Sequence, residues 1–255
     1  HVGATEFTHL EPSCVYLDSA GRTPLPDAAL NAGLVAMRLK AATPWQIGDT
    51  TADRDANRAL FAALLGTPAR PDDICLVPSC SYAMTLASRN CRRRFTGSKR
   101  RVVLLEGQMA SNVLCWQQLV AEVGGELCIV KRPSDYDWTL AVERELGRGD
   151  VAVCALPPAH WCDGSTLDLT SIGKAARARG AALVVDATQW IGATAGGLPV
   201  ADCSFVAASV HKWLLGPYGA CLCYCAPGFW EDAEPLEHHD RNRVGADKVE
   251  CLPMG

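Results

Sequence analysis

Short apolar runs rich in β-branched residues alternate along this chain with longer segments whose apolar residues recur at helical spacing. Seven apolar runs predict strands, over residues 74–77, 101–105, 126–131, 151–156, 181–186, 204–208 and 220–225. The helical spacing is clearest over residues 82–91, 111–123, 139–146 and 169–179, and two further helices are predicted before the sheet, over residues 27–41 and 51–65.

This alternation predicts a three-layer α/β fold. Strands joined through helices imply crossover connections, and therefore a mostly parallel seven-stranded sheet with helices on both faces. Too little helix separates the last two predicted strands for a standard crossover, so we expect one of them to run antiparallel. In such sheets ligands bind beyond the carboxyl ends of the strands. Binding residues are therefore expected directly after Val77, Leu105, Leu156, Val185 and Ala208.

The composition is that of a protein with a substantial core. The 255 residues are 49% hydrophobic and 20% charged, which suits one large α/β domain or one domain with an appendage. A net charge of −4 provides no general attraction to nucleic acid or anionic membranes, and no apolar stretch is long enough to span a bilayer. The basic cluster at 92–101 lacks an accompanying aromatic or glycine motif, so we interpret it as a solvated loop. We expect neither a nucleic-acid nor a membrane partner.

The thirteen cysteines are an odd number, and many lie inside apolar runs. Disulfide frameworks are typical of short secreted chains, so this pattern favours reduced thiols in a cytoplasmic protein. Cys221, Cys223 and Cys225 alternate along one predicted strand, and residues 238–240 (His-His-Asp) follow. The usual zinc spacing is absent and strand cysteines commonly fill cores, so we expect no metal site.

Two predicted strands end in polar side chains. The run at 181–189 ends in Asp186-Ala-Thr-Gln189, and the next apolar strand leads into Ser209-Val-His211-Lys212. Either ending alone is typical of a surface turn. Together, on successive strands and 212 − 186 = 26 residues apart, the aspartate and the lysine indicate a shared site.

A third segment, Ser79-Cys80-Ser81, follows a predicted strand and opens a helix. The free N–H groups and the dipole of a helix start attract an anion. An ordinary helix N-cap at Ser81 is the alternative interpretation.

In this order and spacing, these segments resemble the fold-type I enzymes that use pyridoxal 5′-phosphate (PLP), specifically class V aminotransferases, cysteine desulfurases, selenocysteine lyases and kynureninases. The resemblance runs from Tyr-Leu-Asp-Ser-Ala-Gly-Arg-Thr-Pro at 16–24 to at least Gly219. It implies PLP as the cofactor and a role for each residue. Lys212 forms the Schiff base with PLP and then acts as the base at the substrate α-carbon, and Asp186 pairs with the pyridine nitrogen. Gln189 bonds the ring oxygen, while Ser209, His211, Cys80 and Ser81 hold the phosphate.

The sequence departs from the family pattern at two candidate residues. Met109 stands where relatives place a ring-stacking histidine or aromatic residue. A thioether packs on a π-face but cannot shuttle protons, which weakens the desulfurase and lyase interpretations. Trp161 lies in a Trp-x-Asp-Gly sequence like that of some kynureninase-like aminotransferases. It is expected either to line the substrate pocket or to be a core aromatic beside a turn.

The resemblance implies a PLP-dependent enzyme that acts on an amino acid, with an aminotransferase as the first interpretation. A lyase or hydrolase of the desulfurase or kynureninase type is the second, and a PLP-binding relic without turnover is the third.

We expect an N-terminal arm at 1–26, a large PLP domain at 27–236, and at 237–255 the start of a connection to a small C-terminal domain that this sequence lacks. In relatives that domain usually carries the arginine for the substrate carboxylate. Relatives also imply a homodimer, and apolar residues of the early helices favour one, including Leu34, Met37, Leu39, Trp45 and Ile47.

Overall fold

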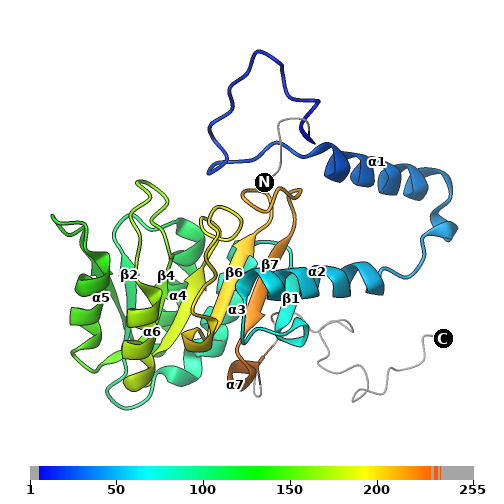
Figure 1. The fold of residues 1–255 in the computed structure, drawn as a ribbon. Coiled ribbons are helices and arrows are strands. Elements are labelled where there is room, and N and C mark those ends of the chain that lie inside the picture. Colours follow the sequence, from blue (N-terminus) through cyan, green and yellow to red (C-terminus); the bar gives the residue numbers. More distant parts are fainter. Residues whose placement is uncertain (1–5, 231–232, 235, 237–255) are drawn as a thin grey trace, which may run out of the picture.

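The computed structural model describes residues 6–230, 233, 234 and 236. Its centre is a seven-stranded sheet with helices on both faces (Figure 1). The strands are β1 (Ile74–Val77), β2 (Arg101–Leu105), β3 (Glu126–Val130), β4 (Val151–Leu156), β5 (Ala182–Asp186), β6 (Phe205–Ser209) and β7 (Cys221–Cys225). The predicted fold class is confirmed, and the predicted strands lie almost at their expected bounds.

The order of the strands in the sheet is β1-β7-β6-β5-β4-β2-β3. The strands β6, β5, β4, β2 and β3 run parallel to one another, whereas β7 is antiparallel to both β6 and β1. The expectation that one of the last two strands runs antiparallel is thus confirmed. The carboxyl ends of β2, β4, β5 and β6 consequently meet at one edge of the sheet, where the polar residues were predicted to gather.

The helices form the outer layers. They are α1 (Asp27–Ala42), α2 (Thr51–Leu65), α3 (Cys80–Cys91), α4 (Leu114–Val123), α5 (Trp138–Leu146), α6 (Leu169–Ala178) and α7 (Pro227–Trp230). Buried side chains of α2, α5 and α6 share one core with the sheet, and those of α3 and α4 share the other. An apolar core therefore covers each face of the sheet. Because the strands are buried on both faces, their sequences are continuous apolar runs.

Two helix starts differ from the predicted positions. The α3 helix begins at Cys80 because the Ser79 hydroxyl caps it, accepting a 3.1 Å hydrogen bond from Tyr82 N. The N-cap is therefore Ser79, and the interpretation of Ser81 as the cap was wrong. The helix predicted over 111–123 begins only at Leu114, since a 3₁₀ turn, Ala110–Asn112, precedes it.

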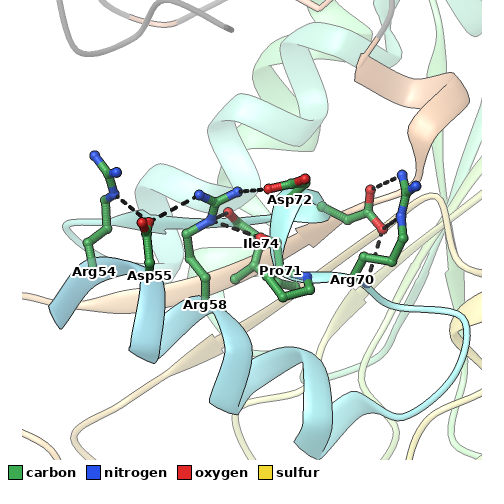
Figure 2. Close-up of polar contacts among 8 residues, drawn as sticks. Arg54, Asp55, Arg58, Arg70, Pro71, Asp72 and Ile74 are labelled. Atoms are coloured by element: carbon green, nitrogen blue, oxygen red, sulfur yellow. Dashed lines mark hydrogen bonds and ion pairs between the residues drawn. The ribbon is translucent and has the colours of Figure 1, made fainter. Parts of the chain in front are cut away.

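The α2 helix is fixed to the start of β1 by a polar network (Figure 2). The Arg58 Nε donates to the carbonyl oxygens of Pro71, at 2.8 Å, and Ile74, at 3.0 Å. Its Nη2 forms a 3.1 Å ion pair with Asp72. Because the Arg58 side chain is only 21% exposed, these contacts anchor α2 firmly to the body.

The α1 helix, by contrast, stands away from the sheet (Figure 1) and has no buried residue. Several of its apolar side chains are exposed, among them Val35 and Met37, and Trp45 follows at 77% exposure. The predicted surplus of apolar surface in this region is therefore present.

The three cysteines of β7 are buried in the core that the sheet shares with α3 and α4. Among the described residues, no group of three potential metal ligands occurs. The histidine pair and aspartate at 238–240 lie outside the described residues, as does the connection expected at 237–255. None of the helices that the structure describes is both long and apolar enough to cross a membrane.

Candidate functional site

Asp186 is the last residue of β5 and lies at the predicted edge of the sheet, with only 8% of its surface exposed. Its Oδ1 accepts a 3.2 Å hydrogen bond from Thr188 N, and the Thr188 hydroxyl accepts a 3.1 Å bond from Ser209 N. Thr188 thus holds the ends of β5 and β6 together. Sequence reasoning missed this residue because it occupies the variable position of Asp-Ala-x-Gln.

Lys212 follows the end of β6 and is 9% exposed. Within the part of the chain that the structure describes, its amine has neither a hydrogen bond nor an ion pair. Burying most of a lysine side chain without a partner for its amine is unfavourable. A largely buried, unpartnered lysine that follows the strand paired with the one ending in Asp186 is therefore poorly explained as a structural element, and it fits a residue that becomes covalently attached to a ligand.

His211 lies between Ser209 and Lys212 in the chain, and its ring packs on Tyr218 with centroids 4.7 Å apart. Burial and then the nearby Lys212 charge lower the pKa of the imidazole below its usual value. The side chain is therefore mainly neutral near pH 7 and keeps one ring N–H as a donor.

The Gln189 amide is engaged on both sides. Its Oε1 accepts a 2.8 Å hydrogen bond from Trp213 Nε1, and its Nε2 donates to the Ala20 carbonyl at 2.9 Å. One amide hydrogen remains for the predicted bond to the ring oxygen of PLP. Gln189 thus also joins the lysine loop to the N-terminal arm, two contacts that its place in the sequence did not indicate.

The start of α3 lies beside Asp186. The Cys221 thiol, burial and the Asp186 carboxylate raise the pKa of the Cys80 thiol well above its usual value, so this thiol stays neutral. The backbone N–H groups of Cys80 and Ser81 are the first two of the helix and have no partner within it. The helix therefore directs two free donors and its positive end toward an anion at this edge.

Met109 and Trp161 follow β2 and β4 at the same edge and are 39% and 47% exposed. The Trp161 indole donates a 2.8 Å hydrogen bond to the Gly107 carbonyl, which joins the two loops. Its exposure shows that the interpretation of Trp161 as a core aromatic was wrong. Among the described residues, no hydrogen bond or ion pair links either side chain to Asp186 or Lys212.

His160, next to Trp161 in the chain, is a buried residue that the sequence reasoning missed. Its ring stacks on Trp138 with centroids 5.5 Å apart, and its Nε2 is 3.0 Å from the Glu106 carbonyl oxygen. Its adjacency to Trp161 was the available signal. Because it is 1% exposed, it supports the loops instead of facing a ligand.

Taken together, the residues at this edge fit PLP. The buried carboxylate of Asp186 matches a protonated pyridine nitrogen, the unpartnered Lys212 amine matches an aldehyde, and the free amides of α3 match a phosphate. The predicted residues Asp186, Gln189, Ser209, His211, Lys212, Cys80 and Ser81 lie on elements that contact one another here, whereas Met109 and Trp161 form a separate group at the same edge.

Comparison with known proteins matches the aminotransferase class-V family model over residues 15–244. An isopenicillin N epimerase of Streptomyces clavuligerus is 27% identical over 252 residues, and a cysteine desulfurase of Klebsiella pneumoniae is 25% identical over 230. These alignments cover 89% and 88% of this chain, but only 57% and 56% of the relatives. The chain thus spans little more than half the length of the curated relatives it matches.

Solved structures show the same fold. A cysteine desulfurase from Escherichia coli superimposes with a TM-score of 0.77 at 21% identity, covering 92% of this chain and 60% of that one. An apo cysteine desulfurase from Thermococcus onnurineus has a TM-score of 0.75 at 20% identity, covering 89% and 57%. At these identities the likeness establishes the architecture alone.

Proposed function

Because this chain belongs to the aminotransferase class-V family, its cofactor is pyridoxal 5′-phosphate, and we propose that it is an enzyme acting at the α-carbon of an amino acid. The observation that carries this proposal is the largely buried Lys212 side chain, whose amine has no partner among the described residues and which follows β6, while the buried Asp186 ends the paired strand β5. A structural lysine at a strand end is expected to reach water or an acidic partner.

In this proposal each residue acts through its observed position. Lys212 would hold the cofactor and would take the proton from the α-carbon of the substrate. Asp186 keeps the pyridine nitrogen protonated through a charged hydrogen bond. The cofactor, when bound, withdraws electrons from the α-carbon. The amides of Cys80 and Ser81 would hold the phosphate, with Ser209 and His211 as further donors, and Gln189 would donate to the ring oxygen.

Among the reactions that begin with loss of the α-proton, we favour a lyase of the cysteine desulfurase type. The support is the similarity to cysteine desulfurases from several bacteria, at 24–28% identity. This was the second interpretation of the sequence, and it now precedes the aminotransferase. Amino-group transfer remains the second candidate, because Met109 places a thioether where a proton-shuttling histidine was expected.

One experiment separates these reactions. The cofactor-loaded protein is supplied with L-cysteine and, separately, with L-alanine plus a 2-oxo acid. With excess dithiothreitol present to supply the two electrons that sulfide release requires, we expect sulfide and alanine from the first mixture, whereas a new amino acid in the second would identify a transferase. Protein that contains the cofactor but catalyses neither reaction, and exchanges no α-proton of either amino acid, would contradict the proposed function.

We also propose that the protein is a homodimer in the cytoplasm, with residues 1–26 as an arm and 27–236 as the PLP domain. The support is α1, a helix with no buried residue and with exposed Val35 and Met37. A helix of this length without tertiary packing is marginally stable in water, and a second copy could cover it.

Sedimentation of the cofactor-loaded protein at micromolar concentration is expected to give a dimer. The double substitution Val35→Glu and Met37→Glu should shift the species to a monomer, because two charges would be buried in the interface. Asn31→Glu, on the same exposed helix but at a polar position, is the matched control. A wild-type monomer would contradict the proposed dimer.

A further inference from the structure

The segment before α1 contains a compact turn. The Asp18 carbonyl accepts hydrogen bonds from Gly21 N and Arg22 N, both at 3.1 Å, and the Tyr16 hydroxyl donates to the Arg22 carbonyl at 2.5 Å. A Cβ on Gly21 would lie 2.5 Å from an Asp18 carboxylate oxygen, so the Asp18 side chain packs closely over this turn. The backbone of Arg22 is thus held at both its N–H and its carbonyl.

This turn packs directly on the candidate site. The Ala20 carbonyl accepts the 2.9 Å hydrogen bond from Gln189 Nε2, and Thr23 N donates to the His211 carbonyl at 3.3 Å. Arg22 lies between these two anchor points in the chain. Because the carbon of the His211 carbonyl forms the peptide bond to Lys212, the turn places Arg22 beside the lysine loop. In Figure 1 the arm passes above the ends of β6 and β7.

The Arg22 side chain is exposed, and its guanidinium has no hydrogen bond or ion pair among the residues that the structure describes. Two other cations near the carboxyl edge are already paired. Lys131 binds Glu106 at 2.7 Å, and Arg132 pairs with Asp163. Arg22 therefore offers a free positive charge held next to residues of the candidate site.

We propose that Arg22 binds the carboxylate of the amino acid substrate. A guanidinium presents a planar set of donors that matches a carboxylate in two parallel hydrogen bonds. An amino acid whose amine is engaged beside Lys212 carries its carboxylate two bonds from that amine. The fixed turn therefore presents the matching cation within the N-terminal arm of this chain itself. This inference rests on the proposed function and names the charge that the substrate must carry.

The test uses two probes that differ in one group, L-alanine and L-alaninamide. Each is titrated into the full chain loaded with PLP, and binding is followed by the change in visible absorbance. Losing hydrogen bonds to a charged group is expected to weaken L-alanine binding to Arg22→Gln by about 10-fold or more. L-alaninamide, which lacks the carboxylate, should bind the variant and the wild type equally. The affinity of Arg22→Lys for L-alanine should lie between those of the wild type and Arg22→Gln, because lysine keeps the charge but lacks the planar guanidinium.

Arg38→Gln is the matched control, since Arg38 is an exposed arginine on α1 without a contact to the lysine loop. It should leave both affinities unchanged. If Arg22→Gln weakens both probes equally, or changes neither, the inference is overturned while the proposed function stands. A wild-type protein that shows no cofactor absorbance would overturn the proposed function, and this inference with it.

Discussion

Substitution of Lys212 by alanine is expected to slow exchange of the substrate α-proton by about 100- to 10,000-fold, the usual contribution of a positioned general base. The reason is structural. Lys212 is a largely buried residue at the carboxyl edge of the sheet, and its amine has no hydrogen bond or ion pair among the described residues. Incorporation of deuterium at the α-carbon of L-alanine in D₂O, followed by NMR with excess PLP present, measures the rate directly.

The control for this experiment is Lys174→Ala. Lys174 is an exposed residue on α6, which covers the face of the sheet opposite α3. The Lys174→Ala variant should exchange the substrate α-proton at the wild-type rate. If Lys212→Ala, correctly folded by circular dichroism, also retained the wild-type rate, another group would be the base and the assignment of Lys212 would be wrong.

The second large effect is expected at Asp186. Removing one partner of a buried charge pair typically costs about 3–5 kcal/mol, which corresponds to a loss of catalytic efficiency of roughly 150- to 5,000-fold. Asp186→Ala removes the carboxylate that would face the pyridine nitrogen. Gln189→Ala removes a neutral hydrogen bond, worth about 0.5–1.5 kcal/mol, and should lower efficiency by only about 2- to 10-fold.

The structure refines this comparison, because Gln189 has a second role. Its substitution leaves the Trp213 indole N–H and the Ala20 carbonyl without their partner. We therefore expect Gln189→Ala to lower the melting temperature as well as the activity. Thermal unfolding and kinetic measurements on both variants test this. Equal losses of activity in the two variants would show that the ring does not lie as proposed.

The strands could be predicted from the sequence because they are buried on both faces. In β4, β5 and β6 every residue is buried, so each appears as a continuous apolar run with a sharp end. The polar residue that ends such a run is conspicuous, and this is how Asp186 was recognised. That one of the last two strands runs antiparallel followed from their short connection, which is also local information.

What the sequence did not predict depends on contacts between distant segments. The bond between Gln189 and Ala20 joins residues 169 positions apart, and no local pattern reports it. The position of the α3 cap was missed for a different reason. Ser79 and Ser81 are both good N-cap residues, and only the backbone geometry selects Ser79.

The reaction class was the least predictable feature from the sequence. Met109 and Trp161 indicated an aminotransferase, whereas the similarity to cysteine desulfurases favours the lyase. All these reactions share the base, the charge pair and the phosphate site. The side chains that separate them contact the substrate, and such residues leave no periodic signal in the sequence.

The most direct test of the central claim is the attachment of the cofactor to Lys212. Protein loaded with PLP is reduced with borohydride, digested and analysed by mass spectrometry, with visible absorbance recorded before and after reduction. We predict loss of the long-wavelength band and a single pyridoxyl adduct on Lys212. An adduct on another lysine, or none in a preparation that carries PLP, would contradict the account.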